Sequence, residues 1–304
     1  MKKRVVAYLK GGLGNQCFIY ATARALALRT GADLAFNLDY FLEDKIYKRK
    51  FELDKFAIKG DVLPLDGMLT RKYAIIRYGF VSRILKATRI GNFQCDKHPR
   101  RYRPMPTEWD GDLLIDGYWH SHAYFDDAWD ELIEDFKLID GTVLYGDDTY
   151  HAIRDTENSV FCHMRSYKEV PGYADGGMAL KVGYYEMAIR AVVERLGARN
   201  MTLFLFSDDL DWATARLKPI VASLGLNVVP VKRVLGFDNQ IRDFVLLGSC
   251  RHGIVANSSF SRFAGMLGQQ ASRKIGREDG VFVRSNCVLP DYCPADWIVI
   301  DKGV

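Results

Sequence analysis

Residues 159–167 read Ser-Val-Phe-Cys-His-Met-Arg-Ser-Tyr, and the interpretation of the whole chain starts from this segment. Its run of β-branched and aromatic residues predicts a short buried strand. The strand delivers His163 and Arg165 to its carboxyl end. In open α/β sheets ligands bind at that edge, and arginine can grip phosphate oxygens through two parallel hydrogen bonds. We therefore expect the rest of the chain to supply the other walls of an anion-binding site.

Strands and helices alternate along the chain after this stretch. Strands are predicted over residues 201–206, 227–231 and 252–256, and helices over residues 184–196, 239–250 and 260–267. Such alternation predicts a parallel sheet with right-handed crossovers, whose strands all end at one edge. That edge is expected to gather His163 and Arg165, then Ser207, Asp208 and Asp209, then Asn257, Ser258 and Ser259.

These residue types fit a nucleoside diphosphate. Ser258 and Ser259 begin a predicted helix, where hydroxyls and free backbone N–H groups bind anions, and Arg165 adds a permanent charge. A carboxylate such as Asp208 can accept two hydrogen bonds from the N–H edge of guanine. Each residue also has a structural interpretation, since Asp208 and the two serines are common helix caps and His163 alone would fit a core.

The N-terminal residues predict a β-α-β unit. Strands are expected over residues 5–9 and 33–38, joined by a helix that ends at Gly31. A tight turn follows the first strand and is made by Gly11, Gly12 and Gly14. A ligand could approach the backbone closely at this turn.

The same layout partly matches a dinucleotide-binding fingerprint. Gly12 and Gly14 open the helix, and Asp39 stands where a ribose-binding acid is expected. Cys17, however, occupies the place of the third glycine. Nicotinamide or flavin binding is therefore an alternative, as is a purely structural role for the glycines in the turn.

Residues 113–119 predict a strand that runs into Gly-Tyr-Trp-His-Ser-His-Ala-Tyr-Phe at 117–125. This cluster fits either a sugar pocket, because sugars stack their apolar faces on rings, or an edge of the core. His120 and His122 lie on one side of an extended chain, but no carboxylate or cysteine is spaced to complete a metal site, so we predict no metal. A helix is expected over residues 126–136.

The length of 304 residues predicts two α/β lobes, residues 1–150 and 151–304. Hydrophobic residues make up 48% and charged residues 26%, which excludes long disorder. The net charge of +4 hides a basic block, residues 71–103, and an acidic block, residues 108–140. Residues 45–107 predict only broken helices. The basic block suits an anionic membrane surface, a phosphorylated substrate or a solvated face. No nucleic-acid-binding motif is present.

The six cysteines contain no C-x-x-C pair, which predicts reduced thiols in a cytoplasmic chain. The apolar run after the basic N-terminus is too short for a signal peptide, and no stretch approaches the roughly 20 apolar residues of a membrane span. Any membrane contact is therefore expected to be peripheral, at the inner face.

Taken together, these motifs resemble the family-11 glycosyltransferases, the α-1,2-fucosyltransferases of bacteria and animals. The resemblance runs nearly end to end, and its last motif is highly specific. The matching stretches are Gly11-Gly12-Leu13-Gly14-Asn15-Gln16, Gly117-Tyr118-Trp119 with Tyr124-Phe125, Phe206-Ser207-Asp208-Asp209, and Ala256-Asn257-Ser258-Ser259-Phe260-Ser261.

The resemblance implies a GT-B-like architecture, two Rossmann-like lobes with a deep interdomain cleft. The first lobe would be the acceptor side and the second would bind the nucleotide sugar. It further implies an inverting transfer of L-fucose from GDP-β-L-fucose, without cofactor or metal, to a hydroxyl of a galactoside, typically O2. The acceptor would belong to a glycan such as a surface polysaccharide or a lipid-linked glycan. Without Mg²⁺, an arginine and helix N-terminal donors must stabilise the leaving diphosphate.

By this resemblance, His163 and Asp208 or Asp209 contact guanosine, Arg165 holds the diphosphate, and Ser258 and Ser259 bond the β-phosphate. The other expected donor contacts are Gly12, Gly14, Asn15, Ser207, Asn257 and Phe260, and the expected acceptor contacts are Trp119, His120 and Tyr124. Catalysis falls to Arg165, with Asp39, Glu169 and His120 as candidate bases, because the attacking hydroxyl needs a proton acceptor within hydrogen-bond reach.

The chain departs from the family pattern at two places. The family usually reads His-x-Arg-Arg-Gly-Asp-Tyr, whereas here Ser166 replaces the second arginine and the Gly-Asp is lost. After Ser261 the family tends to have two tryptophans, and here Arg262 and Phe263 follow. These changes leave two alternatives open, a transferase that uses another GDP-sugar and a non-catalytic nucleotide-sugar-binding homologue.

Overall fold

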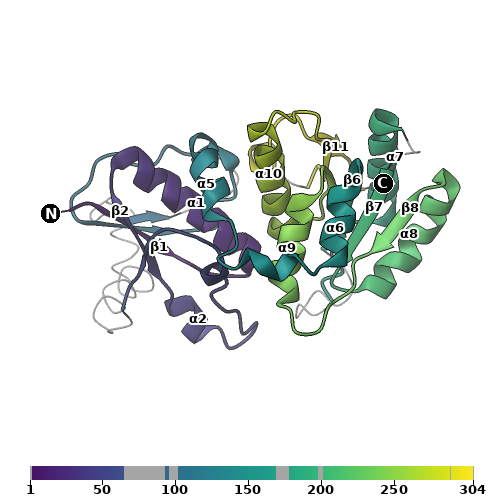
Figure 1. Cartoon of the computed structure of the whole chain (residues 1–304). Coiled ribbons are helices and arrows are strands. Elements are labelled where there is room, and N and C mark those ends of the chain that lie inside the picture. The colour runs from purple at the N-terminus through teal and green to yellow at the C-terminus, as the bar shows by residue number, and fades with distance from the viewer. Residues whose placement is uncertain are drawn as a thin grey trace. The chain divides into compact units, whose positions relative to one another are not determined.

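The computed structural model describes residues 2–64, 93–95, 102–168, 178–197, 201–287 and 289–303. The chain splits into two compact units, Met1–Lys137 and Leu138–Val304 (Figure 1). This division precedes the boundary predicted near residue 150. Helix α6 (Asp148–Asp155) belongs to the second unit, because Asp147 at its N-terminus pairs with Arg242 of that unit.

A parallel sheet with the strand order β3-β2-β1-β5-β4 forms the centre of the first unit. Its strands are β1 (Arg4–Tyr8), β2 (Asp33–Asn37), β3 (Asp61–Val62), β4 (Phe93–Cys95) and β5 (Asp112–Asp116). Helix α1 (Leu13–Thr30) joins β1 to β2 and ends at Gly31, whose φ of 63° lies in the left-handed region that favours glycine. The predicted β-α-β unit is therefore confirmed.

Short elements complete the first unit: α2 (Asp39–Glu43), η1 (Leu53–Lys55), η2 (His122–Tyr124), η3 (Asp126–Ala128) and α5 (Trp129–Asp135). The helix predicted over residues 126–136 is thus a 3₁₀ turn followed by a short α-helix. Helix α1 packs against α5, where Tyr20 Oη and Arg24 Nε donate to Asp135 Oδ2 at 2.7 and 2.8 Å. Most of the basic block lies outside the described residues.

The second unit has a parallel sheet with the order β11-β10-β9-β6-β7-β8. Its strands are β6 (Asn158–Met164), β7 (Met201–Ser207), β8 (Asn227–Pro230), β9 (His252–Ile254), β10 (Phe282–Ser285) and β11 (Ile298–Ile300). Its other elements are η4 (Gly141–Leu144), α7 (Val182–Leu196), α8 (Leu210–Leu224), α9 (Asn239–Ser249), α10 (Ser259–Lys274) and η5 (Pro290–Tyr292). The predicted alternation is confirmed, and β10 and β11 extend the sheet beyond the last strand expected from the sequence.

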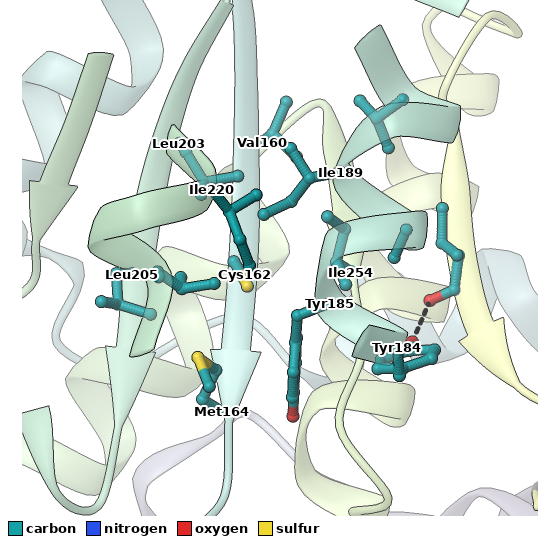
Figure 2. Packing of buried hydrophobic residues seen from close by; sticks show 14 of the residues in the cluster. Val160, Cys162, Met164, Tyr184, Tyr185, Ile189, Leu203, Leu205, Ile220 and Ile254 are labelled. Atoms are coloured by element: carbon teal, nitrogen blue, oxygen red, sulfur yellow. Dashed lines mark hydrogen bonds between the residues drawn. The ribbon is translucent and has the colours of Figure 1, made fainter. Parts of the chain in front are cut away.

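Strand β6 is buried on both faces, which explains its continuous apolar run. Figure 2 shows Val160, Cys162 and Met164 on one face, packed among side chains of helices α7 and α8. Phe161 lies on the other face, and its Cε1 atom would be 2.2 Å from a Cβ added at Gly253 on β9. Position 253 therefore excludes any larger residue unless Phe161 moves.

Both units are α/β with parallel sheets, so the predicted pair of Rossmann-like lobes is confirmed. The interdomain cleft and the assignment of acceptor and donor to separate lobes stay predictions. Within the described part of the chain, no helix is both long and apolar enough to cross a membrane. The cysteines that can be assessed are free thiols, namely Cys17, Cys162, Cys250, Cys287 and Cys293.

Candidate active site

The carboxyl edge of the second sheet gathers residues that the sequence assigns to the donor. Strands β9, β6 and β7 are neighbours, so the segments that follow them meet at one edge. Arg165, just after β6, pairs with Asp208, just after β7, with 3.1 Å between Nη1 and Oδ2. The predicted convergence of residues distant in sequence is thus present for this pair.

Asp208 also holds the backbone that follows β6. Its Oδ1 accepts a hydrogen bond from Ser166 N at 2.7 Å, and its Oδ2 accepts from Ser166 Oγ at 2.9 Å and Tyr167 N at 3.2 Å. Because both oxygens are engaged in this way, Asp208 fixes the position of Arg165. A contact between Asp208 and guanosine stays a prediction.

Tyr167 also lies at this edge, although it was not predicted as a site residue. Its φ of 60° is left-handed, and its hydroxyl donates to the carbonyl of Asn257, so it ties the segment after β6 to the segment after β9. The guanidinium carbon of Arg165 lies 5.4 Å from the centre of its ring. The one available signal was its position directly after the strand.

Asp209, and not Asp208, caps helix α8. Its Oδ1 accepts from Trp212 N at 2.9 Å, and its other oxygen pairs with the ammonium of Lys168. The bonds from Lys168 and from the backbone of Trp212 lower the pKa of Asp209. Ser207 donates its hydroxyl to the Asp209 carbonyl at 3.0 Å, so both residues have structural bonds at the sheet edge.

His163 is 6% exposed, and its imidazole lies 5.9 Å from the ring of Phe260, measured between centroids. Burial and the nearby charge of Arg165 lower its pKa to about 3, so the ring is neutral at physiological pH. Within the described part of the chain, its Nδ1 atom is buried and has no hydrogen-bond partner. A neutral ring with an unused nitrogen can still bond a ligand group.

Helix α10 begins at the same edge. Ser258 is its N-cap, with Oγ accepting from Phe260 N at 3.3 Å, so the cap interpretation holds for this serine. The first turn, which starts at Ser259, contains no acidic residue. The positive end of the 16-residue helix is therefore available to an anion.

The carboxyl edge of the first sheet holds the remaining predicted residues. Asp39, after β2, is buried, and its Oδ2 accepts from Asn37 Nδ2 at 3.0 Å. Asn15 on α1 accepts from His120, which follows β5, with 3.1 Å between Oδ1 and Nε2. A Cβ at Gly11, whose φ is 75°, would lie 2.7 Å from Asn15 Nδ2. Position 11 therefore needs glycine, because its backbone is left-handed and because a side chain there would displace Asn15.

Gly12 is the N-cap of α1, and Gly14 is buried in the first turn of that helix. The guanidinium of Arg49 lies over Gly12, with Nη1 3.7 Å from the position of an added Cβ. Arg49 was not predicted as a site residue, because it lies in an irregular stretch with no motif. Its positive charge lies at the Gly11–Gly14 turn, whose Gly12 and Gly14 are expected to contact the donor.

Of the predicted acceptor contacts, Trp119 and Tyr124 are buried and pack edge to face, with 5.3 Å between ring centroids. They form an edge of the core, because the chain at Trp119 turns its indole inward. His120 is half-buried at the sheet edge. Glu169, the third candidate base, lies outside the described residues.

Comparisons with known proteins identify the family. The model for glycosyl transferase family 11 matches residues 102–279, more than half of the chain. The chain belongs to this family. An α-1,2-colitosyltransferase of Escherichia coli is 27% identical over 309 residues, covering 98% of this chain and 99% of the relative. The O-antigen biosynthesis glycosyltransferase WbnK of Escherichia coli is 25% identical over 280 residues, covering 85% of this chain and 88% of the relative.

Solved structures confirm the GT-B fold of this family-11 glycosyltransferase. The NodZ α-1,6-fucosyltransferase soaked with GDP-fucose has a TM-score of 0.52 at 16% identity, covering 87% of this chain and 92% of NodZ. The R284K mutant of Arabidopsis thaliana FUT1 with GDP has a TM-score of 0.56 at 13% identity, covering 93% of this chain and 70% of FUT1. Among the described residues of the family-11 chain, no three His, Cys, Asp or Glu side chains gather to hold a metal ion.

Proposed function

We propose that this family-11 glycosyltransferase transfers L-fucose from GDP-β-L-fucose to O2 of a galactoside in a surface glycan. The observation that supports this proposal most directly is the position of Arg165, which Asp208 fixes at the sheet edge where helix α10 begins. The similarity to an O-antigen biosynthesis glycosyltransferase supports a surface polysaccharide as the acceptor. We also propose a cytoplasmic location with peripheral membrane contact through the basic block.

The proposed reaction is a direct displacement. The acceptor oxygen attacks C1 of fucose, the bond from C1 to the β-phosphate oxygen breaks, and its electron pair leaves with GDP, so the β donor gives an α product. Arg165 and the N-terminus of α10 stabilise the charge that develops on the diphosphate. This arrangement requires no metal for that charge. His163 offers a neutral ring to the nucleoside.

The proton of the attacking hydroxyl needs an acceptor, and the candidates are Asp39, His120 and Glu169. The first two lie at the carboxyl edge of the first sheet. The variants Asp39→Asn, Glu169→Gln and His120→Gln distinguish between these candidate bases. The base is the residue whose loss abolishes transfer while GDP-fucose still binds.

A second candidate function is the transfer of colitose from a GDP-sugar. The α-1,2-colitosyltransferase matches this chain over nearly the full length of both proteins, and Ser166 changes the motif that follows β6. Competition between GDP-fucose and GDP-colitose for one acceptor decides between the two donors. Tight donor binding without transfer to any acceptor would instead favour the non-catalytic alternative.

The test uses the purified full chain with GDP-fucose, EDTA and a panel of galactosides. Transfer with an α product is expected, and Arg165→Ala is expected to lower turnover by about 10² to 10³. The control is Arg190→Ala, which removes an exposed arginine that pairs along its own helix with Glu186. Absence of both transfer and GDP-fucose binding in the unmodified chain would overturn the proposal.

A further inference from the structure

Trp119 has a backbone conformation that its residue type disfavours. Its φ of 51° lies in the left-handed region, where a bulky side chain is an outlier. Such a conformation persists where the surrounding packing enforces it, and it concentrates at binding sites. Here the packing is clear, because the indole is 3% exposed and meets the ring of Tyr124.

The turn at Trp119 brings its two neighbours together. Tyr118 and His120 stack with 5.5 Å between ring centroids and 14° between planes. The two rings are therefore in contact across the left-handed residue that separates them in the sequence. Tyr118 is 38% exposed, in contrast to the buried tryptophan beside it.

His120 supports this exposed ring from a fixed position. Its Nε2 is 3.1 Å from Asn15 Oδ1, and the edge of its ring meets Phe18 with 5.0 Å between centroids. Because the carbonyl oxygen of Asn15 can only accept, Nε2 carries the proton. The stacked pair is therefore anchored to helix α1 through both a polar and an aromatic contact.

An ion pair contacts the same ring. Lys10 Nζ lies over the Tyr118 ring, 4.9 Å from its centre, and is 2.6 Å from Asp116 Oδ1. Asp116 is buried and Lys10 is half-buried, so this ion pair is held in place at the end of β1 and β5. An ammonium and a carboxylate next to an exposed ring provide a hydrogen-bond donor and an acceptor for hydroxyl groups.

We propose that Tyr118 is the stacking platform for the acceptor galactoside, with the Lys10–Asp116 pair bonding its hydroxyls. The proposal rests on the proposed function, which supplies the galactoside. The axial O4 of galactose leaves the C–H groups of C3, C4 and C5 together on the opposite face, and such groups meet the negative face of an aromatic ring. Tyr118 thus takes the acceptor role that the family resemblance implied for Trp119 and Tyr124, while these two residues position it.

The test measures acceptor and donor separately on the full chain. Tyr118→Ala is expected to raise the KM for methyl β-galactoside by about tenfold or more, with the KM for the GDP-sugar unchanged. Tyr118→Phe is expected to keep a near-normal KM, because the ring face is retained. Tyr145→Ala is the matched control, since Tyr145 is an exposed tyrosine of the second unit.

Galactoside binding without donor, followed by saturation-transfer NMR, separates this proposal from the proposed function. Binding that is lost in Tyr118→Ala but kept in Tyr118→Phe supports the platform even if no fucose is transferred. Normal transfer with an unchanged acceptor KM in Tyr118→Ala overturns the platform and leaves the proposed function standing. No galactoside binding and no transfer in the unmodified chain overturn both.

Discussion

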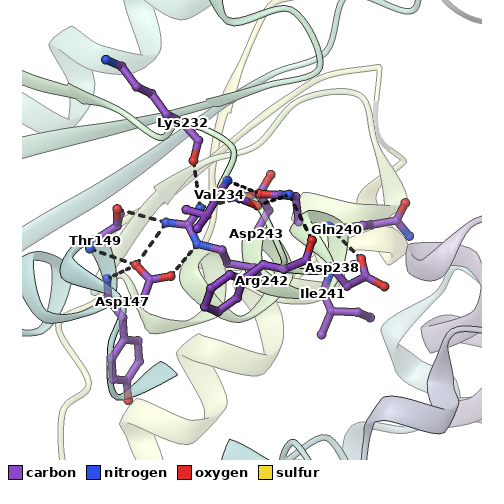
Figure 3. A network of polar contacts seen from close by, with 12 residues as sticks. Asp147, Thr149, Lys232, Val234, Asp238, Gln240, Ile241, Arg242 and Asp243 are labelled. Carbon is purple, nitrogen blue, oxygen red and sulfur yellow. Dashed lines mark hydrogen bonds and ion pairs between the residues drawn. The ribbon is translucent and has the colours of Figure 1, made fainter. Parts of the chain in front are cut away.

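The pair formed by Arg242 and Asp147 gives a sharp stability prediction for the second unit (Figure 3). The guanidinium donates from Nε to Asp147 Oδ2 at 2.5 Å and from Nη2 to Asp147 Oδ1 at 3.1 Å. Nη2 also donates to Thr149 Oγ1, and Nη1 to the carbonyl of Lys232, each at 3.1 Å. The side chains are 2% and 3% exposed, so water cannot replace a lost partner.

Arg242→Met removes the cation and leaves the Asp147 carboxylate buried. Breaking a buried pair from one side costs about 3–5 kcal/mol, because the remaining charge is uncompensated. A domain of this size loses roughly 2–4 °C of melting temperature per kcal/mol. We therefore expect the unfolding midpoint of the second unit to fall by about 6–20 °C.

The measurement is thermal unfolding at pH 7, followed by circular dichroism and calorimetry. Arg190→Met is the matched control, because its partner Glu186 lies on the same exposed helix face and such a pair contributes less than about 1 kcal/mol. The double variant Arg242→Met with Asp147→Asn removes both charges. It is expected to recover about 2 kcal/mol of the summed single losses.

Two results would contradict this prediction. If Arg242→Met shifted the midpoint no more than Arg190→Met, the buried pair would contribute no more than a surface pair. If the double variant lost the sum of the two single losses, the residues would act independently, in conflict with their bidentate contact.

Three further predictions concern the titratable groups. Asp208→Asn keeps the shape of the side chain but loses the charge that holds Arg165. It should lower turnover, measured by GDP release, by about a hundredfold, with little change in the KM for the acceptor. The pKa of His163 is about 3 in the folded chain, against an ordinary value of 6.5, so the unfolded state binds more protons. Stability therefore falls as the pH drops from 6.5 toward 3. His163→Phe should reduce the change in the urea midpoint between pH 7 and pH 5. Burial raises the pKa of Asp243 from 3.8 to about 6, so its ionisation destabilises the fold increasingly as the pH rises through this range and fully above it. Asp243→Asn should therefore raise the melting temperature at pH 8 more than at pH 5.

Strand β6 was predictable because both of its faces are buried, which leaves a continuous apolar run in the sequence. Strands β10 and β11 were not expected, because they are only four and three residues long and β10 contains Arg284. Short strands are stabilised by their neighbours in the sheet more than by their own pattern. Tertiary pairing therefore decides where a short strand forms.

The candidate site was predictable at the level of topology. Parallel strands must end together, so Arg165 and Asp208 meet although they are far apart in sequence. The bonds within the site depend on local backbone conformation, which residue types did not reveal. Tyr167 and Trp119 both adopt left-handed conformations without being glycine, and these decide what Asp208 bonds and which aromatic ring is exposed.

The loss of the second arginine of the family motif does not remove positive charge from this edge. Ser166 is buried and bonds Asp208, so a larger side chain there would displace the carboxylate that holds Arg165. A second guanidinium, that of Arg262 on α10, is buried and lies over the ring of Tyr292, with 5.1 Å between its carbon and the ring centre. Burial raises the pKa of Tyr167 to about 12, and the charges of Arg165 and Arg262 both oppose that rise. The chain thus departs from the motif but keeps Arg165, held by Asp208, at the sheet edge, and either a transferase or a binding homologue would need that charge for a diphosphate.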